Sequence, residues 1–599
     1  MPEELIGAEC AGTLPGLLHE RVQRSPLGVA YREYNNRSRC WTSHSWESIE
    51  IRAASFQAAL AREDLNAGDR VAVWLPNCID WVSFDMASLG LGLVVVPLYA
   101  HDSITNIARI LSHCEARLLF LNTQQQWSDL LQHFRDFPTL SCVWVRESNG
   151  ADLPRPAKSL TEVLPEAAAS DFKIACSSDS LATIIYTSGT TDRPKGCMLT
   201  HFALLWNAEA VTKHIIPRTD DTFLSILPLA HAFERTVGYY VPIIGGCTVA
   251  FARSIEHLPE DLKEIQPTVF LSVPRIYERA YDAIHAAAAG NLLKVLLLRL
   301  SGRLGWQRFQ AVQHRAPPLG LAARLIWPVL EKRVARPIME RFGGKLRVVV
   351  TGGAPMPELV AEFLIAMGMP IVAGYGLTEA GPVVSANSIE DNLPASVGRP
   401  LKGVELSVSK EGELLVHSPA AMSGYWKNPT LTRKTLDADG WIHTGDVAKI
   451  KNERLFITGR LTDILVLSTG EKANASLIEA DIRRDELIDQ ILLVGEGKPF
   501  LVAICVLHQE NWRAYAQESG LDPDTPNSPE AIGNMLVRIS DRLKHYPEHA
   551  QIGAVYLLQS PWTVESGLIT PTLKVKRGKV EQIFHKEIIK LYSGHATFS

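Results

Sequence analysis

The fold of this chain is decided by the stretch Tyr186-Thr-Ser-Gly-Thr-Thr-Asp-Arg-Pro-Lys-Gly-Cys-Met-Leu-Thr-His201. An apolar run precedes it and a helix-like run follows it, so we expect a strand, a polar loop and then a helix. Glycines let backbone amides approach an anion, hydroxyls donate hydrogen bonds, and Lys195 adds a mobile positive charge. The loop therefore suits phosphate, although Ser/Thr/Gly loops are also common as structural connections. It is not a Walker A motif, because Lys195 is followed by Gly196.

Length and composition set the class of protein. A chain of 599 residues is too long for one hydrophobic core, so several domains are expected. The net charge of −5 gives no basic field for nucleic acid, so an anionic ligand must be held by local groups. Nine cysteines lie scattered without C-x-x-C spacing, which argues against a zinc site or disulfide framework and fits a reducing compartment.

Targeting segments are not visible. The first ten residues lack a basic segment followed by an apolar one, which a secretory signal needs. The most apolar short run, Leu89 to Tyr99, falls far below the ~20 residues that span a bilayer. We therefore expect a cytoplasmic protein without a transmembrane anchor.

Helix-like and strand-like segments alternate from residue 40 to 145, which predicts a mostly parallel sheet covered by helices. A second strand–helix–strand unit spans 346–380, with Gly352 and Gly353 at its first turn. From 401 the pattern becomes all-β, and a fresh α+β pattern starts at Ala475. We therefore predict an α/β fold: a large N-terminal domain of βαβ subdomains plus a β-rich subdomain, followed by a small α+β C-terminal domain.

Residues 291–336 differ from their surroundings. They combine Leu and Trp with Lys and Arg, and Glu331 is their only acid. Such a segment suits a membrane surface, where apolar side chains enter the lipid and basic ones meet anionic headgroups. The alternative is a pair of amphipathic helices packed on the body of the protein. The sequence leaves both open.

Six separated motifs in one fixed order resemble those of the adenylate-forming superfamily, which includes acyl-CoA synthetases, nonribosomal adenylation domains and luciferases. They are Tyr186–Gly196, Thr351–Pro355, Gly374–Glu379, Thr444–Asp446, Gly459–Asp463 and Pro571–Lys574. The segments at 227–235, 272–279 and 569–577 resemble the long-chain fatty acyl-CoA synthetase branch. The resemblance covers nearly the whole length. It implies domains at 1–459 (AMP-binding) and 460–599 (a mobile lid).

The resemblance implies a two-step reaction. A fatty acid carboxylate attacks the α-phosphorus of ATP to give acyl-AMP and pyrophosphate, and the thiol of CoA then displaces AMP. Glu379 would bind Mg²⁺, Thr378 the α-phosphate, and Lys574 the charge that builds during adenylation. The remaining nucleotide contacts it implies are Thr187, Ser188, Gly189, Thr190, Thr191, Lys195, Gly353, Tyr375, Asp446 and Arg460.

Three further roles come from the same resemblance. His231 would line the acyl entry, although a histidine among apolar neighbours is by itself more often a core residue. Asp463 would be the hinge about which the lid turns, and the Gly470 loop would border the CoA path. The partners implied are fatty acid, ATP and CoA, with peripheral contact of 291–336 at the inner face of a membrane and no nucleic acid.

Two residues depart from the family pattern. Asp192 stands where glycine is usual and adds negative charge beside the expected pyrophosphate. The segment from Arg460 to Asp463 lacks the basic residue that commonly precedes the aspartate. Two alternatives stay open. One is a fatty acyl-AMP ligase that loads an acyl carrier protein, and the other, motivated by Asp192, is an inactive member that only binds acyl groups or nucleotides.

Overall fold

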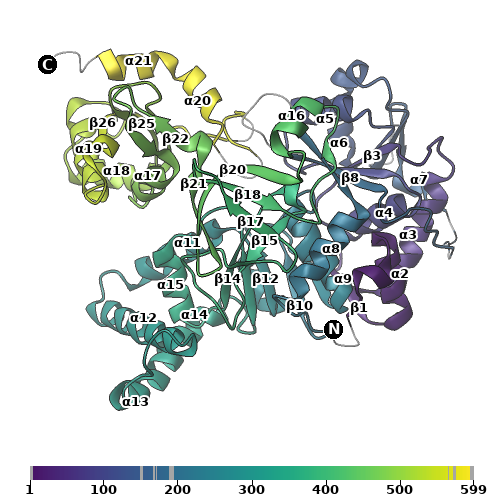
Figure 1. The fold of residues 1–599 in the computed structure, drawn as a ribbon, viewed down its shortest axis with the longest axis horizontal. Helices are drawn as coiled ribbons and strands as arrows, with labels where there is room; N and C mark the ends of the chain where they lie inside the picture. The colour runs from purple at the N-terminus through teal and green to yellow at the C-terminus, as the bar shows by residue number, and fades with distance from the viewer. Residues whose placement is uncertain are drawn as a thin grey trace.

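The computed structural model describes residues 5–148, 153–165, 167, 169, 171–187, 195–563, 566–570 and 575–593. Two parts are visible in Figure 1: a large body that runs from purple to green, and a smaller part, green to yellow, at the upper left. The smaller part has a hydrophobic cluster of its own that begins at Leu465. The predicted α/β class with a separate α+β C-terminal part is confirmed. The boundary between 459 and 460 stays a prediction.

The first sheet of the body has eight strands in the order β19-β9-β8-β4-β3-β5-β6-β7. Strands β4, β3, β5, β6 and β7 run parallel, as the alternating sequence predicts. Buried Val, Leu and Phe side chains on these strands pack beneath the helices. The elements are α3 (Trp46–Leu60), β3 (Arg70–Trp74), α4 (Ile79–Gly90), β4 (Val94–Pro97), α5 (Ile104–Cys114), β5 (Leu118–Thr123), α6 (Gln124–Leu130), β6 (Cys142–Glu147), β7 (Ala157–Ser159) and α7 (Leu160–Val163).

The expected strand–loop–helix layout around the opening stretch is wrong in one respect. Strand β8 (Leu181–Thr187) is followed by a second strand, β9 (Lys195–Thr200), before helix α8 (His201–Thr212) begins. The two strands pair antiparallel, with Thr187 opposite Lys195. Gly196 permits this close pairing, because a Cβ there would lie 2.6 Å from Ile184. Helix α8 therefore begins only after the second of two paired strands.

The second sheet has nine strands in the order β16-β15-β14-β13-β12-β10-β11-β1-β2, parallel in the centre and antiparallel at both edges. Its strands are β1 (Val29–Asn35), β2 (Cys40–Ser45), β10 (Thr222–Ser225), β11 (Thr248–Phe251), β12 (Val269–Ser272), β13 (Val348–Thr351), β14 (Ile371–Gly376), β15 (Val383–Ala386) and β16 (Arg399–Pro400). Its helices include α2 (Leu14–Arg24), the π-helix η2 (Glu234–Tyr240), α9 (Val241–Gly245), α10 (Leu258–Ile265), α11 (Pro274–Ala288), α14 (Arg336–Glu340) and α15 (Glu358–Ala366).

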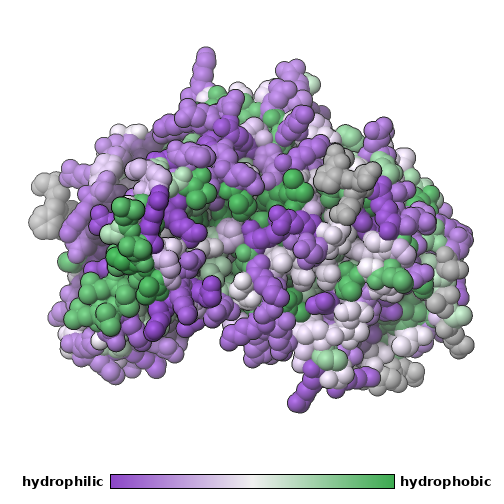
Figure 2. Space-filling view, turned by 90° about the horizontal axis from the view of Figure 1, so that it is seen from below, coloured by the Kyte–Doolittle hydropathy of each residue, from purple (hydrophilic) through white to green (hydrophobic). Residues whose placement is uncertain are grey.

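Residues 291–336 contain the helices α12 (Leu292–Val312) and α13 (Leu321–Leu330), and α13 continues into the π-helix η3 (Glu331–Ala335). One face of α12 packs against the body through the buried Leu298, Ser301 and Gly305. The opposite face leaves several leucines exposed, and Figure 2 shows a green cluster at the left, where these helices point toward the viewer. No helix in the described part of the chain is both long and apolar enough to cross a membrane.

A β-rich subdomain and the lid complete the chain. The subdomain has the four-stranded order β17-β18-β20-β21, and β21 carries this sheet through Arg460. Its elements are β17 (Glu405–Val408), β18 (Glu413–His417), β19 (Gly424–Tyr425, which joins the first sheet), α16 (Pro429–Thr435), β20 (Trp441–Lys451) and β21 (Arg454–Arg460). The lid contains β22 (Ile464–Val466), β23 (Lys472–Asn474), α17 (Ala475–Ile482), β24 (Ile488–Val494), β25 (Leu501–Leu507), α18 (Gln509–Glu518), α19 (Pro529–Arg542), β26 (Ile552–Leu558), α20 (Arg577–Ile583) and α21 (His585–Ser593).

Candidate active site

Asp446 connects two other predicted site residues, Tyr375 and Arg460. The Tyr375 hydroxyl donates a hydrogen bond to one carboxylate oxygen at 2.5 Å, and Arg460 Nε donates to the other at 2.8 Å. The Asp446 side chain is only 6% exposed, and Arg460 balances its charge locally. Burial, together with the Asp446 charge, raises the pKa of Tyr375, which keeps the hydroxyl a donor. A carboxylate accepts about four hydrogen bonds, so each oxygen retains capacity for a ribose hydroxyl.

The local backbone explains the position of Asp446. Asp446 and Arg460 are cross-strand partners of β20 and β21, which brings their side chains together. Thr444 Oγ1 donates to Leu414 O at 2.7 Å and accepts from Asp446 N at 3.1 Å. Gly445 adopts a φ of +70°, and its N–H donates to Glu413 Oε1 at 2.9 Å. The sequence did not reveal Glu413, because only the folded register places it against this turn.

Glu379 lies at a second point of the site. The hydroxyl of Tyr425 donates to Glu379 Oε1 at 2.5 Å, and Met422 N donates to Glu379 O at 2.9 Å. Strand β19 places Tyr425 opposite Cys197, two residues after Lys195. Glu379 and Thr378 are therefore next to β9, the strand that follows residues 188–194. Tyr425 escaped sequence reasoning, because a lone tyrosine 46 residues away gives no local signal.

The donor set at Glu379 fits a magnesium ion. Mg²⁺ is commonly held by one or two carboxylates, with water and substrate phosphate oxygens completing an octahedron. Glu379 supplies one carboxylate, and it is partly exposed beside the strand that carries Lys195. Among the residues that the structure describes, no cluster of three or more His, Cys, Asp or Glu could form a cage made of protein alone. The phosphates of a nucleotide would have to complete such a site.

An open stretch of backbone follows β13. Gly353 has a φ of +78°, and a Cβ placed there would meet nothing within 4 Å. Thr351 is 1% exposed, and its hydroxyl has no hydrogen-bond partner in the described part of the chain. A buried polar atom without a partner costs free energy that a bound ligand can restore. The phenyl ring of Phe233 lies beside Gly352, and His231 Nδ1 accepts from Phe233 N at 3.2 Å.

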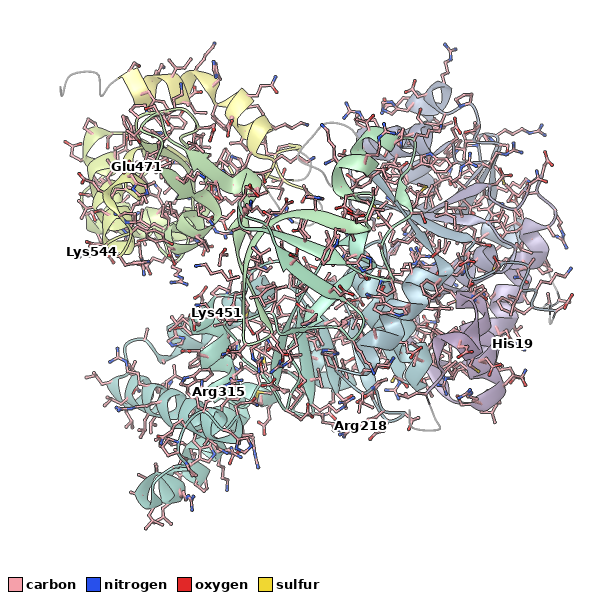
Figure 3. The ribbon with its side chains drawn as sticks, in the orientation of Figure 1. His19, Arg218, Arg315, Lys451, Glu471 and Lys544 are labelled. Atoms are coloured by element: carbon pink, nitrogen blue, oxygen red, sulfur yellow. The ribbon has the colours of Figure 1, made fainter. Side chains whose placement is uncertain are left out.

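The lid contributes Asp463 and Gly470, which lie in different surroundings. Asp463 accepts a hydrogen bond from Ser476, and its other oxygen lies 3.8 Å from Arg577 Nε. Gly470 forms the exposed turn between β22 and β23. Figure 3 labels its neighbour Glu471, which lies within the lid and away from the sheets of the body. The structure therefore does not bring Gly470 to the other site residues.

The opposite end of the lid faces the body. Lys576 lies close enough to Asp102, just before α5, for its charge to oppose the rise in the pKa of Asp102 that burial causes. Lys576 is two residues after Lys574, which lies outside the described residues, as do Ser188, Gly189, Thr190, Thr191 and Asp192. Thr187 ends β8, and Lys195 begins β9, so the two flanks of that loop are in place.

Known proteins share this architecture. The family model described as "AMP-binding enzyme" matches residues 18–426, and that of its C-terminal domain matches residues 462–596. The chain belongs to the AMP-binding enzyme family. The superfamily recognised from the six motifs is thereby confirmed.

Curated relatives within the AMP-binding enzyme family carry related names. Long-chain-fatty-acid–CoA ligase FadD15 of Mycobacterium tuberculosis is 30% identical, with 91% of each chain covered. Human long-chain-fatty-acid–CoA ligase 1 is 31% identical over 87% of this chain and 78% of its own. A chloroplastic long-chain-fatty-acid–[acyl-carrier-protein] ligase of Arabidopsis thaliana, AEE15, is 28% identical over 92% and 82%.

A solved structure shows the same fold. The adenylation domain of carboxylic acid reductase from Segniliparus rugosus, in complex with AMP and a carboxylic acid, matches with a TM-score of 0.74. It is 20% identical, and the match covers 98% of this chain and 94% of that one. At this identity the likeness shows the fold alone. It agrees with the two-part α/β architecture described above.

Proposed function

We propose that this member of the AMP-binding enzyme family is an ATP-dependent ligase that joins a long-chain fatty acid to CoA. The observation that carries the proposal is the cluster of Tyr375, Asp446 and Arg460, which offers a buried carboxylate to a ribose beside the open backbone at Gly353. Relatives at 30–31% identity are named long-chain-fatty-acid–CoA ligases. Their names supply the substrate class.

The first half-reaction joins the acid to AMP. A carboxylate oxygen of the fatty acid bonds to the α-phosphorus of ATP, and the bond from that phosphorus to the pyrophosphate oxygen breaks. Thr378 would bond the α-phosphate, Lys195 and the 187–191 hydroxyls would hold the β and γ phosphates, and Lys574 would neutralise the charge that builds between acid and phosphate. Magnesium held by Glu379 supplies charge neutralisation on the phosphate oxygens when bound.

The second half-reaction releases AMP. The sulfur of CoA bonds to the acyl carbonyl carbon, the bond to the AMP oxygen breaks, and the thiol proton leaves to solvent. Asp446 would still hold the ribose in this step, because the nucleotide remains bound. The Gly470 turn would have to reach the body, since in the present orientation the Lys576 end of the lid faces Asp102. A turn of the lid about the Asp463 region would achieve this exchange.

A panel of acids tests the proposal. Acetate, octanoate, palmitate and a very long chain acid are each incubated with ATP, Mg²⁺ and CoA, and acyl-CoA, AMP and pyrophosphate are measured. We expect all three products with the long-chain acids and little with acetate. Formation of acyl-AMP without acyl-CoA would support transfer to an acyl carrier protein, the activity named for the Arabidopsis relative. Absence of acid-dependent pyrophosphate would contradict the proposal.

We also propose that helices α12 and α13 dock on an anionic membrane surface. Leu292 and Leu296 on α12, and Leu321 and Leu325 on α13, are between 59% and 82% exposed. Contiguous exposed leucines on two neighbouring helices are unusual for a soluble surface and mark an interaction site. Exposed basic residues on the same segment, such as Arg299, Arg303 and Arg324, suit negatively charged headgroups at the inner face of a membrane.

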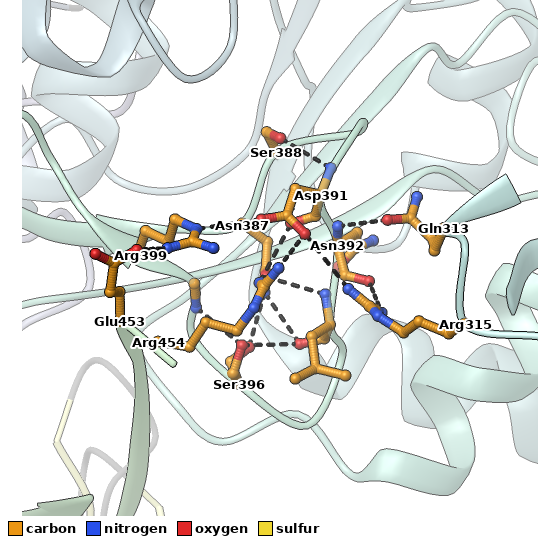
Figure 4. Close-up of polar contacts among 12 residues, drawn as sticks. Gln313, Arg315, Asn387, Ser388, Asp391, Asn392, Ser396, Arg399, Glu453 and Arg454 are labelled. Atoms are coloured by element: carbon orange, nitrogen blue, oxygen red, sulfur yellow. Dashed lines mark hydrogen bonds and ion pairs between the residues drawn. The ribbon is translucent and has the colours of Figure 1, made fainter. Parts of the chain in front are cut away.

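The base of this pair is firmly held. Gln313 and Arg315, just after α12, donate to the backbone oxygens of Ile389 and Asn392 at 2.9 and 2.6 Å. Figure 4 shows both side chains in a network with Asp391 and Arg454 of the body. Arg308 links α12 to the end of α13. Its Nη1 lies 3.6 Å from Glu331 Oε1, and its guanidinium lies over the ring of Trp327. The exposed apolar face is therefore presented by a rigid support.

Vesicle sedimentation tests the docking surface. We expect the protein to bind vesicles that contain phosphatidylglycerol, and a Leu292→Ser, Leu296→Ser, Leu325→Ser variant to lose most of this binding. A control variant, Leu27→Ser with Val537→Ser, removes two exposed apolar side chains elsewhere and should bind normally. Neutralising Arg299 and Arg303 should make binding insensitive to the anionic lipid content. Equal sedimentation of the wild type and the leucine variant would contradict the docking surface.

A further inference from the structure

Arg577 connects the last part of the lid to its first part. Its Nη2 donates to Glu479 Oε1 at 2.6 Å, and its Nη1 donates to Leu493 O at 3.1 Å. Its Nε lies 3.8 Å from Asp463 Oδ1. One guanidinium therefore meets the hinge residue, helix α17 and strand β24 at once. Arg577 is also the first residue of α20 and follows Lys574 by three positions.

The partners of Arg577 are held independently. Asp463 accepts from Ser476, which lies on α17 with Glu479. Glu479 Oε1 also accepts from Leu493 N at 2.7 Å, and its side chain is 13% exposed. Burial raises the pKa of Glu479, and the charge of Arg577 opposes that rise. Without Arg577 this largely buried carboxyl group would lose its cationic partner, so the contact is not a weak surface ion pair.

The chain is anchored differently just before Asp463. Arg460 is fixed to the body by Asp446, while Leu461 and Thr462 are exposed. The contacts of Asp463 with Ser476 and Arg577 belong to the lid. A hydrogen bond of 2.8 Å from Asn474 Nδ2 to Thr458 O crosses between the two parts close to this point. Leu461 and Thr462 are the short exposed stretch between two anchored ends, where backbone torsions can change. A turn of the lid there would have to break the hydrogen bond from Asn474 to Thr458.

We propose that Arg577 is a positioning residue that fixes the lysine-bearing end of the lid to the hinge carboxylate Asp463, so that the lid turns as one body about Leu461 and Thr462. This inference rests on the proposed ligase function and adds a residue for which the family motifs gave no role. The start of α20 keeps its place relative to the hinge through the Arg577 contacts. Adenylation, which needs Lys574 at a set distance from the body, depends on that geometry.

The consequence is unequal for the two half-reactions. In the first, a loose start of α20 would let Lys574 drift from the reacting phosphate, and a displacement of about 1 Å costs up to roughly 100-fold in rate. In the second half-reaction Lys574 would no longer face the phosphate, and AMP would leave from a site built by residues of the body. Loss of Arg577 should therefore slow acyl-AMP formation and leave thioester formation from supplied acyl-AMP nearly unchanged.

Half-reaction kinetics of Arg577→Gln test this role in the full chain. We expect palmitate-dependent exchange of labelled pyrophosphate into ATP to fall on the order of 10- to 100-fold. Acyl-CoA formation from palmitoyl-AMP and CoA should stay within about twofold of the wild type. Arg577→Lys, which keeps one charge but not the three-way contact, should recover part of the exchange rate. Glu479→Gln should lower the exchange rate by a similar factor. The double variant Arg577→Gln, Glu479→Gln should exchange no more slowly than either single variant.

Controls separate the possible outcomes. Lys586→Gln removes an exposed charge from α21, and its exchange rate should match the wild type. Wild-type protein without palmitate-dependent exchange would contradict the ligase proposal itself. A normal wild type combined with equal losses in both half-reactions of Arg577→Gln and Arg577→Lys would assign Arg577 a general structural role and overturn the inference. An unchanged exchange rate in Arg577→Gln would overturn it as well.

Discussion

Arg460 and Asp463 stand three residues apart, yet different parts of the molecule hold them. Arg460 is bound by the buried Asp446 of the body, which also accepts the Tyr375 hydroxyl. Asp463 is bound by Ser476 and lies close to Arg577, both of the lid. The body side of the hinge thus consists of residues proposed to contact the nucleotide. The residues on the lid side are held by hydrogen bonds to other residues of the lid.

This difference separates two kinds of effect. A change on the body side should weaken every step in which the nucleotide is bound, and therefore both half-reactions. A change on the lid side should affect only the step for which that end of the lid faces the body. In the present orientation the end near Lys574 faces Asp102, and the Gly470 turn does not face the site. The orientation described here is therefore the one proposed for adenylation.

The largest expected effect is on the lid side. Lys574→Ala should lower palmitate-dependent pyrophosphate exchange by roughly 10²- to 10³-fold, the scale for losing one group that stabilises transition-state charge. Thioester formation from supplied palmitoyl-AMP should persist. Rapid-quench measurement of the two half-reactions checks this. An equal loss in both would contradict the contrast between the lid side and the body side of the hinge.

On the body side, Asp446→Asn should affect both half-reactions. Replacing the carboxylate removes hydrogen bonds to a charged group worth about 1.5–3 kcal/mol, which corresponds to roughly 10- to 100-fold weaker nucleotide binding. The KM for ATP and that for palmitoyl-AMP should rise together, while the KM for CoA changes little. A rise confined to ATP would show that Asp446 serves only the first step.

Tyr375→Phe is a smaller change on the body side of the hinge. Tyr375→Phe keeps the ring but loses the hydroxyl that donates to Asp446 at 2.5 Å. We expect a rise of up to about tenfold in the KM for ATP, less than that of Asp446→Asn, because Arg460 still balances the carboxylate. Steady-state kinetics at saturating palmitate and CoA measure it. A larger effect than that of Asp446→Asn would mean that the Tyr375 hydroxyl, rather than the Asp446 carboxylate, carries most of the binding.

The smallest effect concerns the body away from the hinge. Glu234 is fully buried, accepts from Ser225 Oγ at 2.6 Å, and has a pKa raised by burial to about 8. The folded state keeps this proton while the unfolded state loses it above about pH 4.5, so stability falls as pH rises from 4.5 to 8. Glu234→Gln should reduce that dependence by on the order of 1–4 kcal/mol. Calorimetry at pH 5 and pH 8 checks it, and the lid transition should not respond.

Elements with regular patterns could be predicted from the sequence. Helix α3 and strands β3, β4 and β5 follow from their spacing of buried residues, because local periodicity determines which face is covered. The strand β9 was missed, since Gly196 and Cys197 interrupt its pattern and only its pairing with β8 and β19 stabilises it. Pairing between distant segments leaves no local signal.

The candidate site shows the same division. Asp446, Glu379 and Tyr375 lie in motifs that a single stretch of sequence carries. Their supporting partners do not: Glu413 and Tyr425 reach the site through β18 and β19, far from the motifs they hold. Arg577 is a further case, because its importance depends on the meeting of α20 with α17. Such residues become visible only when the tertiary contacts are known.

The central claim is best tested by acid-dependent exchange of labelled pyrophosphate into ATP, measured with palmitate and Mg²⁺ and without CoA. The ligase account predicts exchange that requires palmitate, falls strongly in Lys574→Ala, and is followed by palmitoyl-CoA when CoA is added. Pyrophosphate exchange that is absent with palmitate, or that proceeds equally without any acid, would contradict it.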